Sequence, residues 1–265
     1  MKKLSLLLAL IMVLGCVFTV FTACNKDDDN KDDANTGKKP GGTTSTEKIS
    51  MVCLGDSITY GQDGTPGKEG EQMKKPYPII IKNQLKYDVD NIAVPGATIR
   101  TGVERDNSDG GAKIRESIQD QLDKIKGTPD IISIMGGVND CGNFVLGENT
   151  PNNKDTANFY GALRKMCGEL KTTYPDAYIF FITPLRTRTY SDPTVDSTLK
   201  TICEAIKTVC AAYDIPVYDA FTEIEIDFTK PETSSDGVHI AADVIEDVVA
   251  PKIIQFIKDN YKKAE

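Results

Sequence analysis

Short apolar segments alternate with longer amphipathic segments along most of the chain beyond residue 46. The short segments are rich in Ile, Val, Phe and Met without strict apolar–polar alternation, which is typical of strands covered on both faces. Five strands are therefore expected, at 49–54, 89–94, 130–135, 177–183 and 215–218. The amphipathic segments predict helices at 77–86, 112–126, 156–174, 194–213 and 241–262, the last kinked or split at Pro251.

This alternation predicts an α/β fold with a doubly wound, five-stranded parallel sheet between two helical layers, of the flavodoxin-like, three-layer α/β/α type. In such sheets, sites form in the loops beyond the carboxyl ends of the strands. Ser57 follows the first strand, Gly96 the second and Asn139 the third, while Asp236 and His239 follow the fifth. We therefore expect these five residues to lie along one rim of the sheet.

The N-terminal residues 1–23 have the pattern of a signal peptide. A positive start is followed by an uncharged, mostly apolar run that ends in small residues before Cys24. This ending favours a secretory signal over a spanning helix. The boundary resembles the lipobox of bacterial lipoproteins, with lipidation expected at Cys24, although Phe21 stands where Leu is commoner. A second lipobox-like segment at 13–16 and an uncleaved anchor remain alternatives, and every one of these interpretations places the folded part outside the cytoplasmic membrane, at the cell envelope or surface.

Residues 24–46 are expected to form a disordered tether. Beyond Cys24 they contain no large apolar residue, so they cannot bury enough surface to offset the entropy of ordering. Their acidic runs lack the turn glycine and terminal glutamate of a calcium-binding loop. Residues 47–265 are long enough for one domain with a substantial core.

Charge and cysteine content exclude several classes of function. The chain has a net charge of −8, which makes nucleic acid and anionic lipid headgroups poor partners and leaves the lipid anchor as the only expected membrane contact. Five of the seven cysteines lie beyond Cys24, without paired spacing, and are expected to be buried apolar residues. The sequence holds no CxxC or HExxH motif, so neither a metal nor another cofactor is expected.

His239 is the only histidine, and it follows Asp236 by three residues. Acid–base chemistry by an imidazole near neutral pH therefore falls to this one residue. Together with Ser57 at the end of the first strand, Asp236 and His239 supply the parts of an acyl-transfer triad. The alternatives are a histidine in a surface loop, a serine in a tight turn and an aspartate that caps the last helix.

Four segments resemble the conserved blocks of the SGNH, or GDSL-type, hydrolase family. They are GDSIT at 55–59, NIAVPGAT at 91–98, GVND at 137–140 and DGVH at 236–239, and they occur in the family's order across nearly the whole domain. Ala93 stands where the family often has glycine, whereas Gly96 is retained.

The resemblance implies a serine esterase that works through an acyl-enzyme. Ser57 would be the nucleophile, His239 its base and Asp236 the residue that orients the imidazole. The oxyanion-hole donors would be the backbone N–H groups of Ser57 and Gly96 and the side-chain amide of Asn139. The alternative interpretations are that Gly96 is only a turn glycine after Pro95 and that Asn139 bonds within its own loop.

The acidic neighbours of these positions, Asp56 and Asp140, are expected to brace the loops by hydrogen bonding.

The substrate is less strongly indicated. Long segments at 60–76, 99–111, 141–155 and 184–193 would wall the site. In the last of them, Arg186, Arg188 and Tyr190 would either contact a sugar or carboxylate or lie in a solvated loop. The sequence shows no extended apolar lid for a long acyl chain, and the folded part is expected outside the cytoplasmic membrane. Both points favour an enzyme that removes acetyl or similar short acyl groups from carbohydrates.

Three other functions remain open. A lysophospholipase or thioesterase is the alternative enzyme, and a surface glycan-binding module without turnover is the alternative outside catalysis. A phosphate-binding loop at 55–61 is disfavoured because Asp56 would repel the phosphate.

Overall fold

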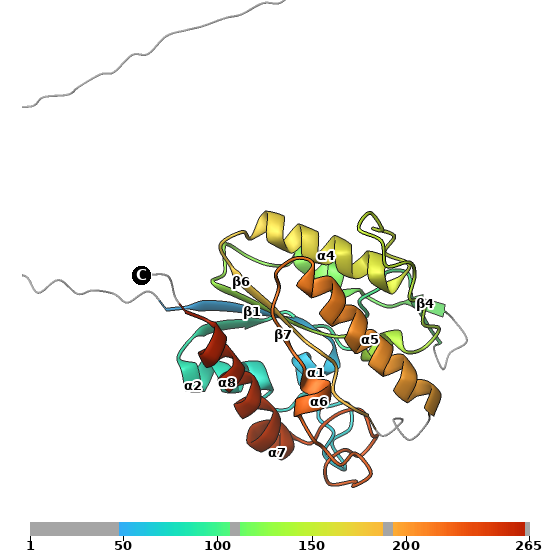
Figure 1. Ribbon diagram of the computed structural model, residues 1–265. Helices are drawn as coiled ribbons and strands as arrows, with labels where there is room; N and C mark the ends of the chain where they lie inside the picture. Colours follow the sequence, from blue (N-terminus) through green and yellow to red (C-terminus); the bar gives the residue numbers. More distant parts are fainter. Residues whose placement is uncertain (1–47, 107–111, 188–192, 263–265) are drawn as a thin grey trace, which may run out of the picture. The chain divides into compact units, whose positions relative to one another are not determined.

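The computed structural model describes residues 48–106, 112–187 and 193–262, and these form a five-stranded parallel sheet between two layers of helices (Figure 1). The strand order is β2-β1-β5-β6-β7. The strands are β1 (Ser50–Gly55), β2 (Asp88–Asn91), β5 (Ile131–Met135), β6 (Tyr178–Ile182) and β7 (Val217–Tyr218). The predicted doubly wound α/β fold is confirmed. The order reverses direction between β1 and β5, which is where ligand sites form in such sheets.

Alternate residues of each central strand pack on opposite layers. In β1, Met51 and Cys53 join one apolar cluster, and Val52 and Leu54 join the other. The first cluster includes α2 (Tyr77–Leu85) and α8 (Ala250–Asn260). The second includes α3 (Ile118–Leu122), α4 (Phe159–Thr173) and α5 (Pro193–Ala211). Figure 1 shows α4 and α5 on one side of the sheet and α2 and α8 on the other. Burial on both faces explains why the strand sequences are continuous apolar runs without alternating polar residues.

Only residues 118–122 of the helix predicted at 112–126 are helical. Residues Ala112–Ile114 form strand β4, which pairs antiparallel with β3 (Glu104–Asp106) as a two-stranded hairpin outside the main sheet. The helix α3 begins only after Ser117, which forms a capping box with Asp120. This reciprocal cap satisfies the first free N–H groups of the helix at that point, so the helix has a defined start there.

The C-terminal helical segment accommodates Pro251 without a break. It runs from α7 (Ala242–Val244) through a π-helical turn, η3 (Ile245–Val249), into α8. Pro251 lies in the first turn of α8, where a missing N–H is tolerated best. The predicted kink or split is thus replaced by a local widening of the helix.

Several expectations fall on residues outside this description, including the signal peptide, lipidation at Cys24, the whole tether, and Arg188 and Tyr190. The chain separates into two units, Met1–Ser45 and Thr46–Glu265. The five cysteines of the described residues are free thiols, four of them buried and Cys141 half-buried. Within the same residues, no helix combines the length and apolar character needed to cross a membrane.

Candidate active site

Ser57 lies at a sharp turn where β1 ends and the one-turn helix α1 (Ser57–Tyr60) begins. Asp56 is the N-cap of this helix, and its carboxylate accepts a hydrogen bond from the Ile58 N–H at 3.0 Å. At Gly55, an added Cβ would lie 2.3 Å from the Thr59 hydroxyl and 2.5 Å from the Met135 carbonyl oxygen. Only glycine fits so close to these atoms, and the turn therefore holds the Ser57 hydroxyl at the carboxyl end of the strand.

The structure brings the side chains of Ser57, His239 and Asp236 into one hydrogen-bonded chain. His239 Nε2 lies 2.9 Å from Ser57 Oγ, although the two residues are 182 positions apart. On the other side of the ring, His239 Nδ1 lies 2.5 Å from Asp236 Oδ2. With Nδ1–H donating to the carboxylate, Nε2 is left as the acceptor for the serine proton, which is the arrangement an activated hydroxyl requires.

The loop that carries His239 is held from within by Asp236. The second carboxylate oxygen of Asp236 accepts the N–H groups of Val238 and His239, both at 2.8 Å. Gly237 has a positive φ of 83°, and its N–H donates to the buried Ser234 hydroxyl at 2.8 Å. Burial alone would raise the pKa of Asp236, but the hydrogen bonds from the His239 ring and the two N–H groups outweigh it, and the pKa is lowered. Asp236 is therefore charged at neutral pH.

A second set of bonds fixes this loop against the segment after α1. The Ser235 N–H donates to the Gly64 carbonyl at 2.8 Å, and the Gly64 N–H donates to the Ile240 carbonyl at 3.1 Å. The two segments come from opposite ends of the domain, so this pairing sets the distance between the serine and the imidazole.

Gly96 and Asn139 lie together beyond β2 and β5. Gly96 has a φ of 80°, a conformation that favours glycine. The Asn139 amide nitrogen donates one hydrogen to the Ala97 carbonyl at 3.0 Å, which leaves its second hydrogen available. In the described residues, the backbone N–H groups of Ser57 and Gly96 donate to no protein acceptor. These three groups are the kind of donors that an oxyanion requires.

Asp140 and Gln121 brace the loops around these donors. Asp140 is fully buried and accepts the N–H groups of Ile99 and Arg100 at 2.8 and 3.0 Å, and it pairs with the Arg100 guanidinium at 3.2 Å. Gln121 bonds both the N–H and the carbonyl of Gly55, at 2.9 and 2.8 Å. The bracing roles expected for Asp56 and Asp140 are thus present. Gln121 was missed, because nothing in its local sequence distinguishes it from an exposed helical glutamine.

The Asp56 carboxyl is buried beside Ser57 and has an unusual pKa. Burial raises the pKa of Asp56 to about 7, and the negative charge of Asp140 adds to the rise. The hydrogen bond from the Ile58 N–H lowers the pKa but does not outweigh burial. A carboxyl that titrates near neutral pH thus lies next to the serine.

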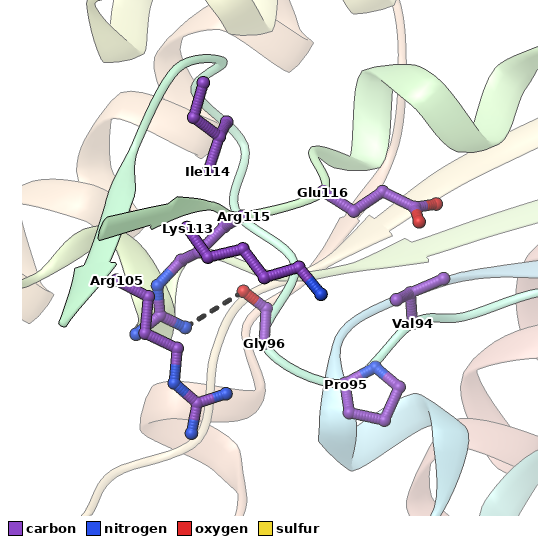
Figure 2. A pocket seen from close by; sticks show the side chains of 8 residues that line it. All are labelled: Val94, Pro95, Gly96, Arg105, Lys113, Ile114, Arg115 and Glu116. Carbon is purple, nitrogen blue, oxygen red and sulfur yellow. Dashed lines mark hydrogen bonds between the residues drawn. The ribbon is translucent and has the colours of Figure 1, made fainter. Parts of the chain in front are cut away.

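Two pockets of very different size border residues of the proposed site or their neighbours. A pocket of about 450 Å³ borders Gly96 and is lined by the hairpin β3–β4 and the residues after it (Figure 2). A pocket of about 10 Å³ lies against Asp56, Ile58 and Val238, the immediate neighbours of Ser57 and His239. Arg186 also lines this small pocket, where its Nε donates to the Phe221 carbonyl at 3.0 Å and its guanidinium covers the Phe221 ring.

The described residues contain no group of three or more His, Cys, Asp or Glu side chains that could hold a metal ion. The chemistry available at this site is that of the serine, the imidazole, the carboxylates and the N–H donors.

The family model of the GDSL-like lipase/acylhydrolase family matches residues 53–243, a span that runs from β1 through the loop with His239. The chain belongs to the GDSL-like lipase/acylhydrolase family. No curated protein matches it in sequence.

Solved structures of this acylhydrolase fold superpose on the chain at low sequence identity. A structure described as a GDSL-like lipase from Bacteroides uniformis is 18% identical with a TM-score of 0.57, and the match covers 80% of this chain and 96% of that one. An aryl esterase from M. smegmatis is 18% identical with a TM-score of 0.57, covering 80% of this chain and 100% of that one. A carbohydrate acetylesterase from Sinorhizobium meliloti is 18% identical with a TM-score of 0.56, covering 81% and 100%. At these identities the likeness establishes the fold.

Proposed function

We propose that this acylhydrolase-family chain is a serine esterase that removes short acyl groups, and that its natural substrates are acetylated carbohydrates. The observation that carries the proposal is the hydrogen-bonded chain from Ser57 Oγ through the His239 ring to Asp236. In an acylhydrolase family, this arrangement supplies what ester cleavage demands of a serine, which is a base within bonding reach of its proton.

The reaction follows from the positions of these groups. As Ser57 Oγ attacks the ester carbonyl carbon, His239 Nε2 takes the hydroxyl proton, and Asp236 stabilises the resulting imidazolium. The carbonyl oxygen becomes an oxyanion that accepts hydrogen bonds from the N–H groups of Ser57 and Gly96 and from the Asn139 amide. The proton then passes from His239 to the departing alkoxide, leaving the acyl group on Ser57. A water molecule attacks this acyl-enzyme by the same steps and releases the acid.

The preference for a short acyl group rests on the small pocket. Its volume of about 10 Å³ corresponds to roughly one water molecule, and Met135, Val138 and Leu185 line it with apolar atoms. A methyl group is close to this size, whereas a long acyl chain has no room among the described residues there. Similarity in fold to a carbohydrate acetylesterase further supports acetylated sugars as the first substrates to test.

The decisive experiment replaces the serine. Ser57→Ala is expected to lower kcat/KM for p-nitrophenyl acetate by at least about 1,000-fold and to abolish labelling by a fluorophosphonate, because no other hydroxyl among the described residues is paired with the single imidazole. Ser197→Ala, on the exposed surface of α5, is the matched control and should keep both. Hydrolysis or labelling that survives in Ser57→Ala would refute the proposed nucleophile.

A substrate screen separates the alternatives. Acetylated xylan, acetylated monosaccharides, a lysophospholipid and an acyl thioester should be compared with the purified protein. Deacetylation of the sugars with little release of long acyl chains is expected. Faster cleavage of the lysophospholipid or thioester would replace the carbohydrate assignment, and binding of glycans that Ser57→Ala leaves unchanged, without turnover, would indicate a binding module.

A further inference from the structure

The pocket beside Gly96 is lined by three cationic side chains (Figure 2). Arg105 comes from β3, Lys113 from β4, and Arg115 from the segment that follows β4. The complete lining consists of Val94, Pro95, Gly96, Arg105, Lys113, Ile114, Arg115 and Glu116. Such a concentration of positive charge contrasts with the chain as a whole, whose net charge is −8.

None of these three cations forms an ion pair with a carboxylate whose side chain the structure describes, a set that excludes Asp106 and residues 107–111. Glu116, the one acidic residue of the lining, pairs instead with Lys124. Burial lowers the pKa of Arg115, and the positive charge of Arg105 lowers it further, while Asp140 acts in the opposite direction. Two guanidinium groups are thus held close enough to repel one another. An anion placed between them would relieve this repulsion.

The cations also lie beside the proposed oxyanion donors. Arg115 Nη1 donates to the Gly96 carbonyl at 3.0 Å and to the Asn139 side-chain oxygen at 3.4 Å. A Cβ added at Gly96 would lie 3.2 Å from Arg115 Nη1 and 3.9 Å from Arg105 Nη1. A substrate whose ester oxygen is held at Gly96 therefore has a neighbouring part within reach of both arginines.

The two pockets suit different parts of an ester. The small apolar pocket lined by Asp56 and Ile58, on either side of Ser57, fits the acyl group, as argued above. The pocket of about 450 Å³, which is open and polar on the hairpin side, has room for the alcohol part.

We propose that the pocket formed by Arg105, Lys113 and Arg115 is a specificity site for an anionic group on the alcohol part of the ester. Acylated acidic sugars, bearing a carboxylate, sulfate or phosphate, are the class of substrate that fits. This inference rests on the proposed esterase function and narrows its substrates. Arg105 and Lys113 bind the anion, while Arg115 also positions Gly96 and Asn139.

The test compares esters that differ only in charge. We choose 4-acetoxybenzoate and its neutral amide, 4-acetoxybenzamide, because both present the same acetyl group on a ring of the same shape. The wild-type protein is expected to favour the benzoate in kcat/KM by about tenfold at low ionic strength, mainly through KM, after correction for spontaneous hydrolysis. The preference should shrink as salt is added, because the charges lie at an open surface.

Removing two of the charges should remove the preference. The variant Arg105→Gln/Lys113→Gln is expected to hydrolyse the two esters at nearly equal kcat/KM, with the loss falling on the benzoate. The matched control is Lys82→Gln/Lys258→Gln, which makes the same change in net charge on the exposed surfaces of α2 and α8, away from the hairpin (Figure 1). This control should retain the wild-type preference, and a preference lost equally in both double variants would indicate a general field effect and overturn the specific site.

The outcomes separate this inference from the function on which it rests. A wild-type protein that treats both esters alike, or a double variant that keeps the preference, would overturn the anionic site even if Ser57→Ala abolishes all hydrolysis. Continued hydrolysis of p-nitrophenyl acetate by Ser57→Ala would instead refute the esterase mechanism. Parallel measurements with 4-acetoxybenzenesulfonate and 4-acetoxyphenyl phosphate distinguish carboxylated from sulfated and phosphorylated substrates.

Discussion

At the scale of single residues, the site depends on side chains whose ionisation is set by their surroundings. Asp236 and Asp56 both belong to the loops around Ser57, yet the pKa of Asp236 is lowered by hydrogen bonds that outweigh its burial, and the pKa of Asp56 is raised to about 7 mainly by burial. The first can stay charged as a partner for imidazolium. The second is a structural cap whose charged form is poorly solvated, because it lies inside the turn.

The Asp56→Asn variant tests this difference through stability. The folded protein keeps the Asp56 proton up to about pH 7, whereas the unfolded chain releases it near pH 3.8. The contribution of the protonated Asp56 to the free energy of unfolding is therefore fully present below pH 3.8 and is lost as the pH rises to 7. Asparagine keeps an oxygen for the Ile58 N–H but carries no charge. We expect the variant to exceed the wild type in free energy of unfolding by on the order of 4 kcal/mol at pH 8, with little difference at pH 4. Urea denaturation at both pH values is the measurement, and a difference that does not change with pH would contradict the assignment.

At the scale of elements, the site is assembled by contacts between loops rather than within any helix or strand. The loop around His239 meets the segment after α1 through the paired bonds of Gly64 with Ser235 and Ile240. An added Cβ at Gly64 would lie 2.0 Å from the His239 carbonyl oxygen. Because the carbonyl belongs to the backbone and a Cβ is fixed rigidly to it, neither atom can move aside without shifting the loop.

We therefore expect Gly64→Ala to displace His239 from Ser57. The predicted effect is a fall in kcat/KM for p-nitrophenyl acetate of about 100-fold, since a displacement of about 1 Å can cost that much. A loss of roughly 1 to 3 kcal/mol in unfolding free energy should accompany it. Gly142→Ala is the control, because an added Cβ there meets no atom within 4 Å. Wild-type activity in a folded Gly64→Ala protein would show that this contact does not position the imidazole.

At the scale of the whole molecule, every contact of the site described above lies within the unit Thr46–Glu265. Export and lipidation at Cys24 remain proposals that concern where the enzyme works, since residues 1–47 lie outside the described structure. The chemistry and the anchoring are thus assigned to separate parts of the chain.

A protein that begins at Thr46 should consequently fold and keep the full-length kcat/KM for p-nitrophenyl acetate within about twofold, because the core and site described above are built from residues of the unit Thr46–Glu265. The full-length chain expressed in a bacterial host should incorporate labelled fatty acid, and Cys24→Ala should not. Loss of activity in the shortened protein would show that the first 45 residues contribute to the fold or the site.

The sequence by itself determined the five strands, their parallel arrangement and the identity of the residues proposed for catalysis. Buried strands and amphipathic helices leave local patterns, and Ser57, Asp236 and His239 are chemical types that stand out in a chain with a single histidine. Tertiary structure alone decided the hairpin β3–β4, where the sequence predicted a long loop over β3 and an amphipathic helix over β4. It thereby decided the meeting of Arg105, Lys113 and Arg115 beside Gly96. It also decided the bonds from Gln121 to Gly55 and from Gly64 to the His239 loop. These depend on which distant backbone segments come into contact, and that is set by packing of the whole domain rather than by neighbouring residues.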